Sequence, residues 1–260
     1  MQILAAAGFP VVGEAFLGKW EDSIRDANPR GFFESPFRRG IYHATNPDDD
    51  GRFLFPQSVR RHAVKIFVPG LVRTDYAFID HVVATMRHWR EYVGSLERLH
   101  RMEDAYLRNH PQEGQQRPER SSLPAWLEWW QLHYDLIRDV ATRRYRFHMQ
   151  TYESLLEDPE RSLGKVIAWL GGGDIAAAVA AVEPGLQTQR DRSGAGASDC
   201  EVSEILDELY DTVHRDRSMS KGFIDKLNAT QRQVEELVAA RRGPTISPSI
   251  IDKVSVVPTT

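Results

Sequence analysis

The sequence predicts an α/β protein whose core is a doubly wound parallel sheet, followed by a helical C-terminal region. Three short runs rich in apolar residues, at 63–68, 81–86 and 145–152, have the length and composition of strands. The first two are almost continuously apolar, as strands buried on both faces of a parallel sheet are. Helix-like segments separate the later runs, and strands that alternate with helices are typical of this fold class.

The composition is that of an ordinary globular protein and argues against several classes of partner. Of the 260 residues, 41% are hydrophobic and 27% are charged. The net charge of −4 comes without a basic run, so we expect neither a nucleic-acid partner nor a membrane partner. Cys200 is the only cysteine, which excludes an intramolecular disulfide and fits a cytoplasmic protein.

The elements before the first long strand are expected to be short. Residues 1–8 are predicted to be the end of a helix with Gly8 at its C-cap, and residues 9–12 to be extended. A polar segment with several glycines and prolines then predicts loops, before a possible helix at 36–46. Residues 46–51 predict a turn; their acidic run lacks the spacing of a calcium loop, so no metal is expected.

The second half of the chain is predicted to be mainly helical. Its predicted elements are a helix at 89–108, an exposed linker at 111–122, a long helix opened by Pro124, a helix from Asp158 to Leu170 ended by glycines 171–173, and helices at 200–215 and 223–241. The tail from Gly243 is predicted to be disordered. We therefore expect an α/β domain at 1–192, a helical extension at 193–242 and a tail at 243–260.

Four pieces of the sequence, in this order, carry a resemblance to a known family. They are LAAAGFPVVGEAF with NPRGFFES, MRHWREYVGS, TYESLLEDPERSLGKVIAWLG and VEPGLQTQR, and they lie within residues 1–190. Together they resemble the bacterial branch of the PAPS-dependent sulfotransferases. The resemblance implies a P-loop-like fold and PAPS (3′-phosphoadenosine 5′-phosphosulfate) as co-substrate, with no metal. It also implies transfer of a sulfuryl group to a hydroxyl or amine of a small-molecule acceptor.

The second piece contains the candidate nucleotide-binding pair. Arg87 follows a predicted strand and Ser95 comes eight residues later, which resembles the 3′-phosphate motif of the family. A guanidinium donates to phosphate oxygens bidentately, and a neighbouring hydroxyl adds another donor. Outside this ordered context, the same spacing would fit an arginine in a surface ion pair beside a small helical residue.

Glu34 is the candidate catalytic base, because the resemblance places an active-site residue in its segment. A solvated loop carboxylate, or one that fixes the loop, fits the sequence equally well. His43 and His88 are lesser candidates. Lys65 lies inside an apolar run, where an ammonium group is costly, so we expect it to reach a carboxylate or a phosphate, or its strand to be partly exposed.

Two further groups of residues have weaker functional interpretations. Lys221, within Ser-Lys-Gly, resembles the basic motif with which cytosolic sulfotransferases close on the nucleotide, although a helix boundary explains it as well. Trp126 and Trp130, with Trp129 and Tyr134, could line an acceptor pocket. Aromatic residues at helical spacing are more often part of a core.

The family's first strand and Gly-rich phosphate-binding loop have no counterpart in this sequence. Residues 1–3 are expected to fall inside the helix that follows that loop. The sequence therefore supports two hypotheses: a sulfotransferase, which the absence of the phosphate loop would leave inactive as given, or a non-catalytic remnant or interaction protein on the same fold. A nucleotide kinase would also need a Gly-rich loop with a lysine.

Overall fold

The computed structural model describes residues 1–15, 30–48, 50–110, 123–186, 192 and 200–242. The chain divides into two compact units, Met1–Met219 and Ser220–Thr260. The first unit is a mixed α/β structure, and the second consists of helix α10 in its described part. The helix at 203–214 belongs to the first unit.

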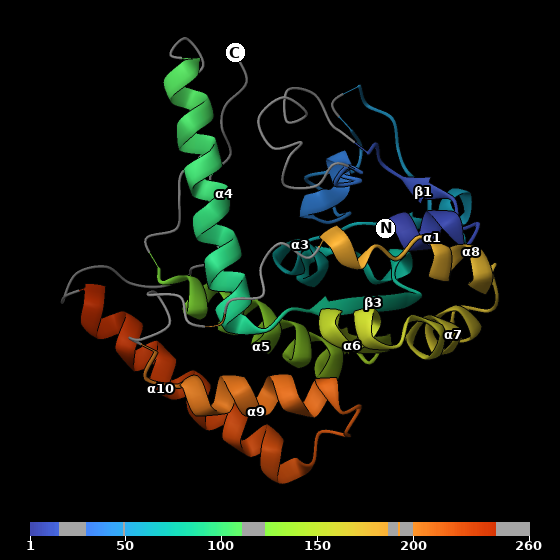
Figure 1. Cartoon of the computed structure of the whole chain (residues 1–260). Coiled ribbons are helices and arrows are strands. Elements are labelled where there is room, and N and C mark those ends of the chain that lie inside the picture. Colours follow the sequence, from blue (N-terminus) through green and yellow to red (C-terminus); the bar gives the residue numbers. More distant parts are fainter. Residues whose placement is uncertain (16–29, 49, 111–122, 187–191, 193–199, 243–260) are drawn as a thin grey trace. The chain divides into compact units, whose positions relative to one another are not determined.

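The described strands form two small parallel sheets (Figure 1). Strand β1 (Val11–Val12) pairs with β2 (Ala63–Val64), and β3 (His81–Met86) pairs with β4 (Arg146–Thr151). In the second sheet the register runs from His81 opposite Arg146 to Met86 opposite Thr151. Among the described residues these pairs are not joined into the single doubly wound sheet that the sequence predicts.

Helices make up most of the first unit. They are α1 (Gln2–Ala6), α3 (Val68–Arg73), α4 (Trp89–Asn109), α5 (Ala125–Arg143), α6 (Tyr152–Glu157), α7 (Pro159–Trp169), α8 (Ile175–Ala180) and α9 (Ser203–His214). Short 3₁₀ turns cover Pro36–Arg39, Pro56–Val59, Tyr76–Phe78 and Pro184–Leu186. In the second unit, α10 spans Lys221–Arg242, and the Ser220 hydroxyl accepts a hydrogen bond from the Phe223 amide.

Several predicted elements are confirmed, and their boundaries lie at the residues that the sequence indicates. Strand β3 occupies 81–86 as predicted, and α4 begins at Trp89 as predicted. Helix α7 begins after Asp158, whose carboxylate accepts from the Arg161 amide at 3.0 Å, with Pro159 in the first turn. The glycines that follow α7 include Gly171 and Gly172 at φ 88° and 101°, a backbone region that favours glycine.

Two predicted elements are wrong in extent. The strand expected at 63–68 ends at Val64, and Val68 already begins α3 with Pro69 in its first turn. The helix expected at 36–46 is only the 3₁₀ turn Pro36–Arg39, because the chain reverses at Gly40 with φ 104°. Strands β2 and β3 are also mostly half-buried, whereas the sequence had predicted burial on both faces.

The exposed linker and the tail, which are expected at 111–122 and 243–260, lie outside the described residues.

The acidic turn forms as predicted at 46–51. Asp48 accepts hydrogen bonds from the amides of Asp50 and Arg52, at 3.1 and 2.8 Å. The side chain of Asn46 pairs with both backbone groups of Leu54. These contacts explain the turn as a local hydrogen-bonded structure.

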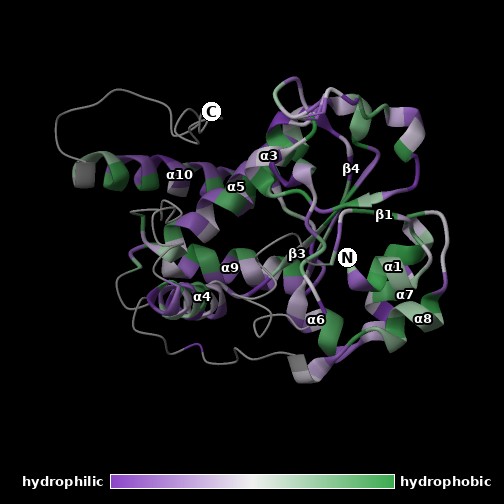
Figure 2. Cartoon of the chain, turned by 90° about the horizontal axis from the view of Figure 1, so that it is seen from above, coloured by the Kyte–Doolittle hydropathy of each residue, from purple (hydrophilic) through white to green (hydrophobic). Residues whose placement is uncertain are grey.

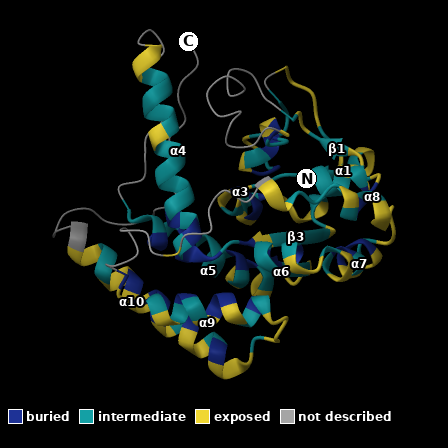
Figure 3. Ribbon diagram, viewed as in Figure 1, coloured by how far each residue is buried: buried dark blue, intermediate teal, exposed yellow. Residues whose placement is uncertain are grey.

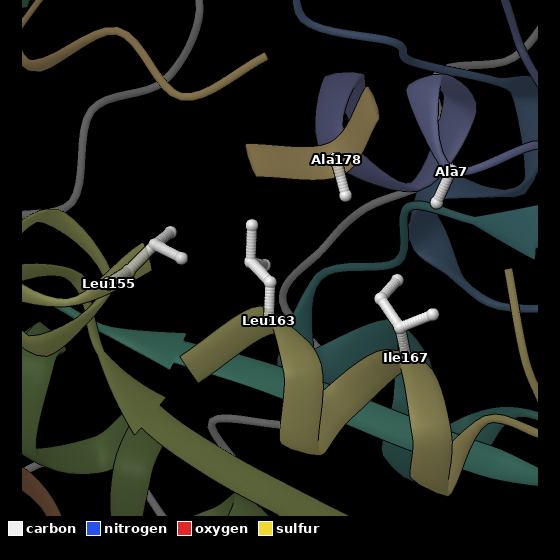
Figure 4. Close-up of a cluster of buried hydrophobic side chains, with 5 residues drawn as sticks. All are labelled: Ala7, Leu155, Leu163, Ile167 and Ala178. Atoms are coloured by element: carbon white, nitrogen blue, oxygen red, sulfur yellow. The ribbon is translucent and has the colours of Figure 1, made fainter. Parts of the chain in front are cut away.

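Among the described residues, two hydrophobic clusters pack parts of the first unit. One contains Ala7, Leu155, Leu163, Ile167 and Ala178, and Figure 4 shows the α7 side chains pointing toward α1 and α8. Hydrophobic residues are correspondingly frequent along α1, α7 and α8 (Figure 2). The other cluster is built on three buried residues from α3, α5 and the start of β4: Leu71, Leu136 and Tyr145. This second cluster packs beside β3 and fixes the strand that leads to Arg87.

Two glycines allow the turn at 36–40 to approach α3 closely. A Cβ placed on Gly70 would lie 2.3 Å from the carbonyl carbon of Arg39, and one on Gly40 would lie 2.3 Å from the Gly70 oxygen. The Thr74 hydroxyl accepts from the Ile41 amide at 3.1 Å across the same contact. The side chain at position 70 must therefore be a hydrogen atom for these segments to pack.

Gly70→Ala is expected to destabilise the protein by about 2 kcal/mol or more, because the new methyl group meets backbone atoms that cannot move aside. Alanine normally stabilises a helix by about 1 kcal/mol relative to glycine. Gly164→Ala in α7 is the matched control, since its added Cβ meets no atom within 4 Å, and it should be stabilising. Urea unfolding of both variants checks this; stabilisation by Gly70→Ala would contradict the packing described.

None of the helices in the described ranges is both long and apolar enough to cross a lipid bilayer.

Candidate anion-binding site

Arg87 occupies the connection between a parallel strand and a long helix. Strand β3 ends at Met86, and His88 is the N-cap of α4. The carboxyl ends of parallel strands lie at one edge of a sheet, where ligands of α/β proteins commonly bind. A helix N-terminus at the same place favours negative charge. The backbone thus places an arginine where an anion is electrostatically favoured.

The structure brings the two residues of the predicted pair together. The Arg87 Nη1 donates to the Ser95 hydroxyl at 3.1 Å. The guanidinium also lies over the ring of Tyr152, 5.3 Å from its centroid, as the register of Met86 opposite Thr151 leads one to expect. The indole N–H of Trp129 donates to the Arg87 carbonyl at 2.9 Å. Side chain and backbone of Arg87 are therefore both held in position.

Within the described part of the chain, no carboxylate lies within ion-pair distance of Arg87. The neighbouring arginines are already neutralised: Arg90 donates to both oxygens of Asp207, at 2.8 and 3.1 Å. Arg192 donates to Glu91 at 3.0 Å and to Glu153 at 2.8 Å. A guanidinium has five N–H donors, so Arg87 retains donors beyond the one given to Ser95.

A hydrogen-bonded group of side chains from four parts of the chain supports this edge of the sheet. The Tyr210 hydroxyl donates to Glu153 at 2.8 Å, on the oxygen that also accepts from Arg192. Burial opposes ionisation of Glu153, but the hydrogen bonds from Tyr210 and Arg192 hold its pKa below the usual value. Burial raises the pKa of Tyr210. The phenol is thus a donor that keeps Glu153 charged and fixed.

His88 is a buried, neutral imidazole at the start of α4. Its Nδ1 accepts from the Arg90 amide at 3.2 Å, so the ring acts as the N-cap side chain, and its Nε2 lies 3.4 Å from Asp207. Burial, reinforced by the charge of Arg192, lowers its pKa to about 4. Figure 3 shows that the buried part of α4 is its first turns, around Trp89. Protonation of Nδ1 would remove the acceptor that caps the helix.

His88→Asn is expected to make the protein less sensitive to acid. Because the pKa falls from 6.5 in the unfolded chain to about 4, the unfolded state binds more protons between these values, and stability is lost as pH falls through this window. The loss amounts to about 3 kcal/mol. Asparagine also caps helices but does not titrate.

Urea unfolding between pH 4 and 7 checks the expectation, with the exposed His43→Asn as control. The His43 variant should keep the pH dependence of the native chain, whereas the His88 variant should have a shallower one. Equal slopes for native and His88→Asn protein would contradict a buried neutral His88.

Glu34 is buried, with 8% of its surface exposed, and it is part of an ion-pair cluster. Its Oε2 accepts from Arg38 at 2.6 Å, and its Oε1 accepts from Lys65 at 3.4 Å. Lys65 also donates to the Phe32 carbonyl at 3.1 Å and lies over the rings of Phe32 and Phe67. Lys65 thus reaches a carboxylate, one of the outcomes expected for it. In the described residues, the contacts of Glu34 and those of Arg87 share no residue.

The remaining candidate residues lie in other surroundings. Trp126 and Trp130 are 2% and 0% exposed, so neither indole has an open face in this structure, and their acceptor-binding role stays a prediction. Lys221 begins α10 in the second unit and is described with that helix alone. His43 is exposed in a turn. Residues 16, 28 and 29 of the first motif and 187–190 of the fourth lie outside the described residues.

Sequence reasoning missed the residues that hold the candidate site in place. The sequence predicts Tyr152 to be a strand end and Trp129 to be part of a pocket or core. The contact of Tyr152 with Arg87 follows from strand register, which a single sequence does not give. The charge of Lys65 within an apolar run was a usable signal for its contact with Glu34.

Comparison of the chain with family models, curated proteins and solved structures found no match. Among the described residues there is no group of three or more histidine, cysteine or acidic side chains that could hold a metal ion together. The described candidate site consists of Arg87, Ser95 and the residues that hold them. These groups can bind an oxyanion through charge-assisted hydrogen bonds.

Proposed function

We propose that this chain binds the nucleotide of PAPS, with Arg87 and Ser95 on its 3′-phosphate, and acts in sulfuryl transfer to a small-molecule hydroxyl or amine. The observation that carries the proposal is the Arg87–Ser95 contact of 3.1 Å at the carboxyl end of β3, with no carboxylate paired to Arg87 among the described residues. An arginine that is fixed but not neutralised is suited to a phosphate.

The proposal includes a P-loop-like arrangement, although β1–β2 and β3–β4 are separate two-stranded sheets in the described residues. Support comes from the parallel direction of both pairs and from the helices that follow β3 and β4. The strand-to-helix edge that carries Arg87 is where such sheets bind nucleotides.

In the proposed reaction, the acceptor oxygen or nitrogen attacks the sulfur of PAPS while the bond from sulfur to the 5′-phosphate oxygen breaks. The proton of the acceptor passes to Glu34, and PAP (adenosine 3′,5′-bisphosphate) leaves. Each oxygen of Glu34 accepts from one cation, Arg38 or Lys65, and keeps a further lone pair with which to accept the proton. The same two cations stabilise the charged form of Glu34.

The contacts of Glu34 with Arg38 and Lys65 favour a second candidate function, that of a non-catalytic nucleotide-binding protein on this fold. A buried carboxylate that joins Arg38 to Lys65 has a sufficient structural role. Under this alternative the chain binds PAP but transfers no sulfuryl group.

Two measurements on the full chain test the proposal. Calorimetric titration with PAP should give saturable binding of one nucleotide per chain. Incubation with PAPS and a set of phenols, alcohols and amines should then transfer the sulfuryl group, and Glu34→Gln should abolish transfer while keeping PAP binding. Binding without transfer in the native chain would select the non-catalytic alternative, and absence of PAP binding would refute both.

A further inference from the structure

Helix α9 packs against both strand-to-helix connections of the second sheet, and it lies outside the four sequence pieces that resemble the sulfotransferases. One connection joins β3 to α4 and contains Arg87. The other joins β4 to α6, which begins at Tyr152. Asp207 and Tyr210 are three residues apart on α9, so they share the face of the helix that meets these connections.

The contacts of α9 with the first connection hold the start of α4. The Asp207 carboxylate accepts from the indole N–H of Trp89 at 2.6 Å. The phenol ring of Tyr210 makes a T-shaped contact with the imidazole of His88, with 4.8 Å between the ring centroids. His88 directly follows Arg87, so α9 supports the backbone next to the guanidinium.

The hydroxyl of Tyr210 contacts the second connection. It donates to the Glu153 Oε2 at 2.8 Å. Glu153 directly follows Tyr152, whose ring centroid lies 5.3 Å from the guanidinium carbon of Arg87. Tyr210 is only 3% exposed, so its ring is confined between these two contacts.

Tyr210 is therefore joined both to the residue after Arg87 and to the residue after Tyr152. The guanidinium and the ring that lies over it depend on this one phenol for their relative position. A binding group has to be held to within about 0.5 Å of its productive geometry. Arg192 also donates to Glu153, at 2.8 Å, so loss of the phenol hydroxyl loosens Glu153 without releasing it completely.

We propose that Tyr210 is a positioning residue for the 3′-phosphate site, an assignment that rests on the function proposed above. Through His88 and Glu153 it sets the geometry of Arg87 and Tyr152, and thereby the preference for nucleotides that carry a 3′-phosphate. Helix α9 thus contributes to nucleotide specificity through the neighbours of the binding residues.

Calorimetric titration of Tyr210→Phe with PAP and with adenosine 5′-monophosphate measures this preference. The substitution keeps the ring and removes the hydroxyl. We expect the ratio of the affinity for PAP to that for adenosine 5′-monophosphate to fall about fivefold. Glu153→Gln should lower the same ratio, and the double variant should show less than the sum of the two effects, because both substitutions break one contact.

Tyr145→Phe is the matched control. The Tyr145 hydroxyl also donates to a carboxylate that an arginine holds, that of Asp139 with Arg143, but at the opposite end of β4. This variant should lose a similar amount of stability in urea unfolding and keep the native ratio of affinities. An equal fall of the ratio in Tyr145→Phe would show general destabilisation and overturn the positioning role.

The remaining outcomes separate this proposal from the proposed function. If the native chain prefers PAP and both Tyr210→Phe and Glu153→Gln keep that preference, the role of Tyr210 is only structural, while the proposed function stands. If Tyr210→Phe does not fold, Glu153→Gln alone decides. A native chain that does not bind PAP would refute the proposed function and the role of Tyr210 with it.

Discussion

Replacing Arg143 by methionine is expected to destabilise the first unit by about 3–5 kcal/mol, because it leaves a buried carboxylate without its cation. Arg143 donates to both oxygens of Asp139, at 2.8 and 2.5 Å. It also donates to the carbonyls of Leu71 and Thr74, at 2.6 and 2.7 Å. Asp139 is 8% exposed and accepts in addition from the hydroxyl of Tyr145. One side chain therefore joins the end of α5 to the end of α3.

Urea unfolding of Arg143→Met measures the loss, with Arg138→Met as control. Arg138 is exposed on the same helix, and its replacement should change stability by no more than about 0.5 kcal/mol. The double variant Asp139→Leu/Arg143→Met should recover part of the lost stability, because the unpaired charge is then absent. Similar effects of Arg143→Met and Arg138→Met would mean that the network does not stabilise the fold.

Arg87→Ala is expected to weaken PAP binding about 100-fold. Truncating one member of a desolvated charge pair costs roughly 2–5 kcal/mol, and about 2.7 kcal/mol corresponds to this factor. The loss concerns the guanidinium donors, since the helix N-terminus and the Ser95 hydroxyl remain. Arg101→Ala on the exposed part of α4 is the matched control and should bind PAP as the native chain does.

Calorimetric titration measures both variants, and circular dichroism confirms that each is folded. Arg87→Lys should recover only part of the affinity, because an ammonium group cannot donate bidentately in a fixed plane. Full affinity in Arg87→Ala would remove Arg87 from the proposed site.

The sequence was a good guide where a strong hydrophobic period met clear boundary residues. The strand at 81–86 is followed by a helix whose hydrophobic period and length make it recognisable from the sequence. Asp158 and Pro159 mark the start of another helix. The strand predicted at 63–68 is wrong in extent because an apolar run fits a strand or the start of a buried helix equally well. Pro69 lies in the first turn of α3, where proline favours a helix start. Gly40, with a positive φ, similarly ends the 3₁₀ turn at Pro36–Arg39, where the composition predicts a helix as far as residue 46.

The candidate site was predictable only where it is local in sequence. Arg87 and Ser95 lie on one strand-to-helix connection, so their spacing anticipated their contact. Tyr152 and Trp129 reach Arg87 through strand pairing and helix packing, across 42 residues of chain or more, and no local pattern encodes such contacts.

The ratio of affinities for PAP and adenosine 5′-monophosphate, measured in the native chain and in Arg87→Ala, tests the central claim most directly. The two nucleotides differ by the 3′-phosphate, so the ratio isolates the contribution of that group. If Arg87 holds the 3′-phosphate, the native chain prefers PAP strongly and the preference falls toward one in Arg87→Ala. A preference that survives the substitution, or a native chain that binds both nucleotides equally, would contradict the account.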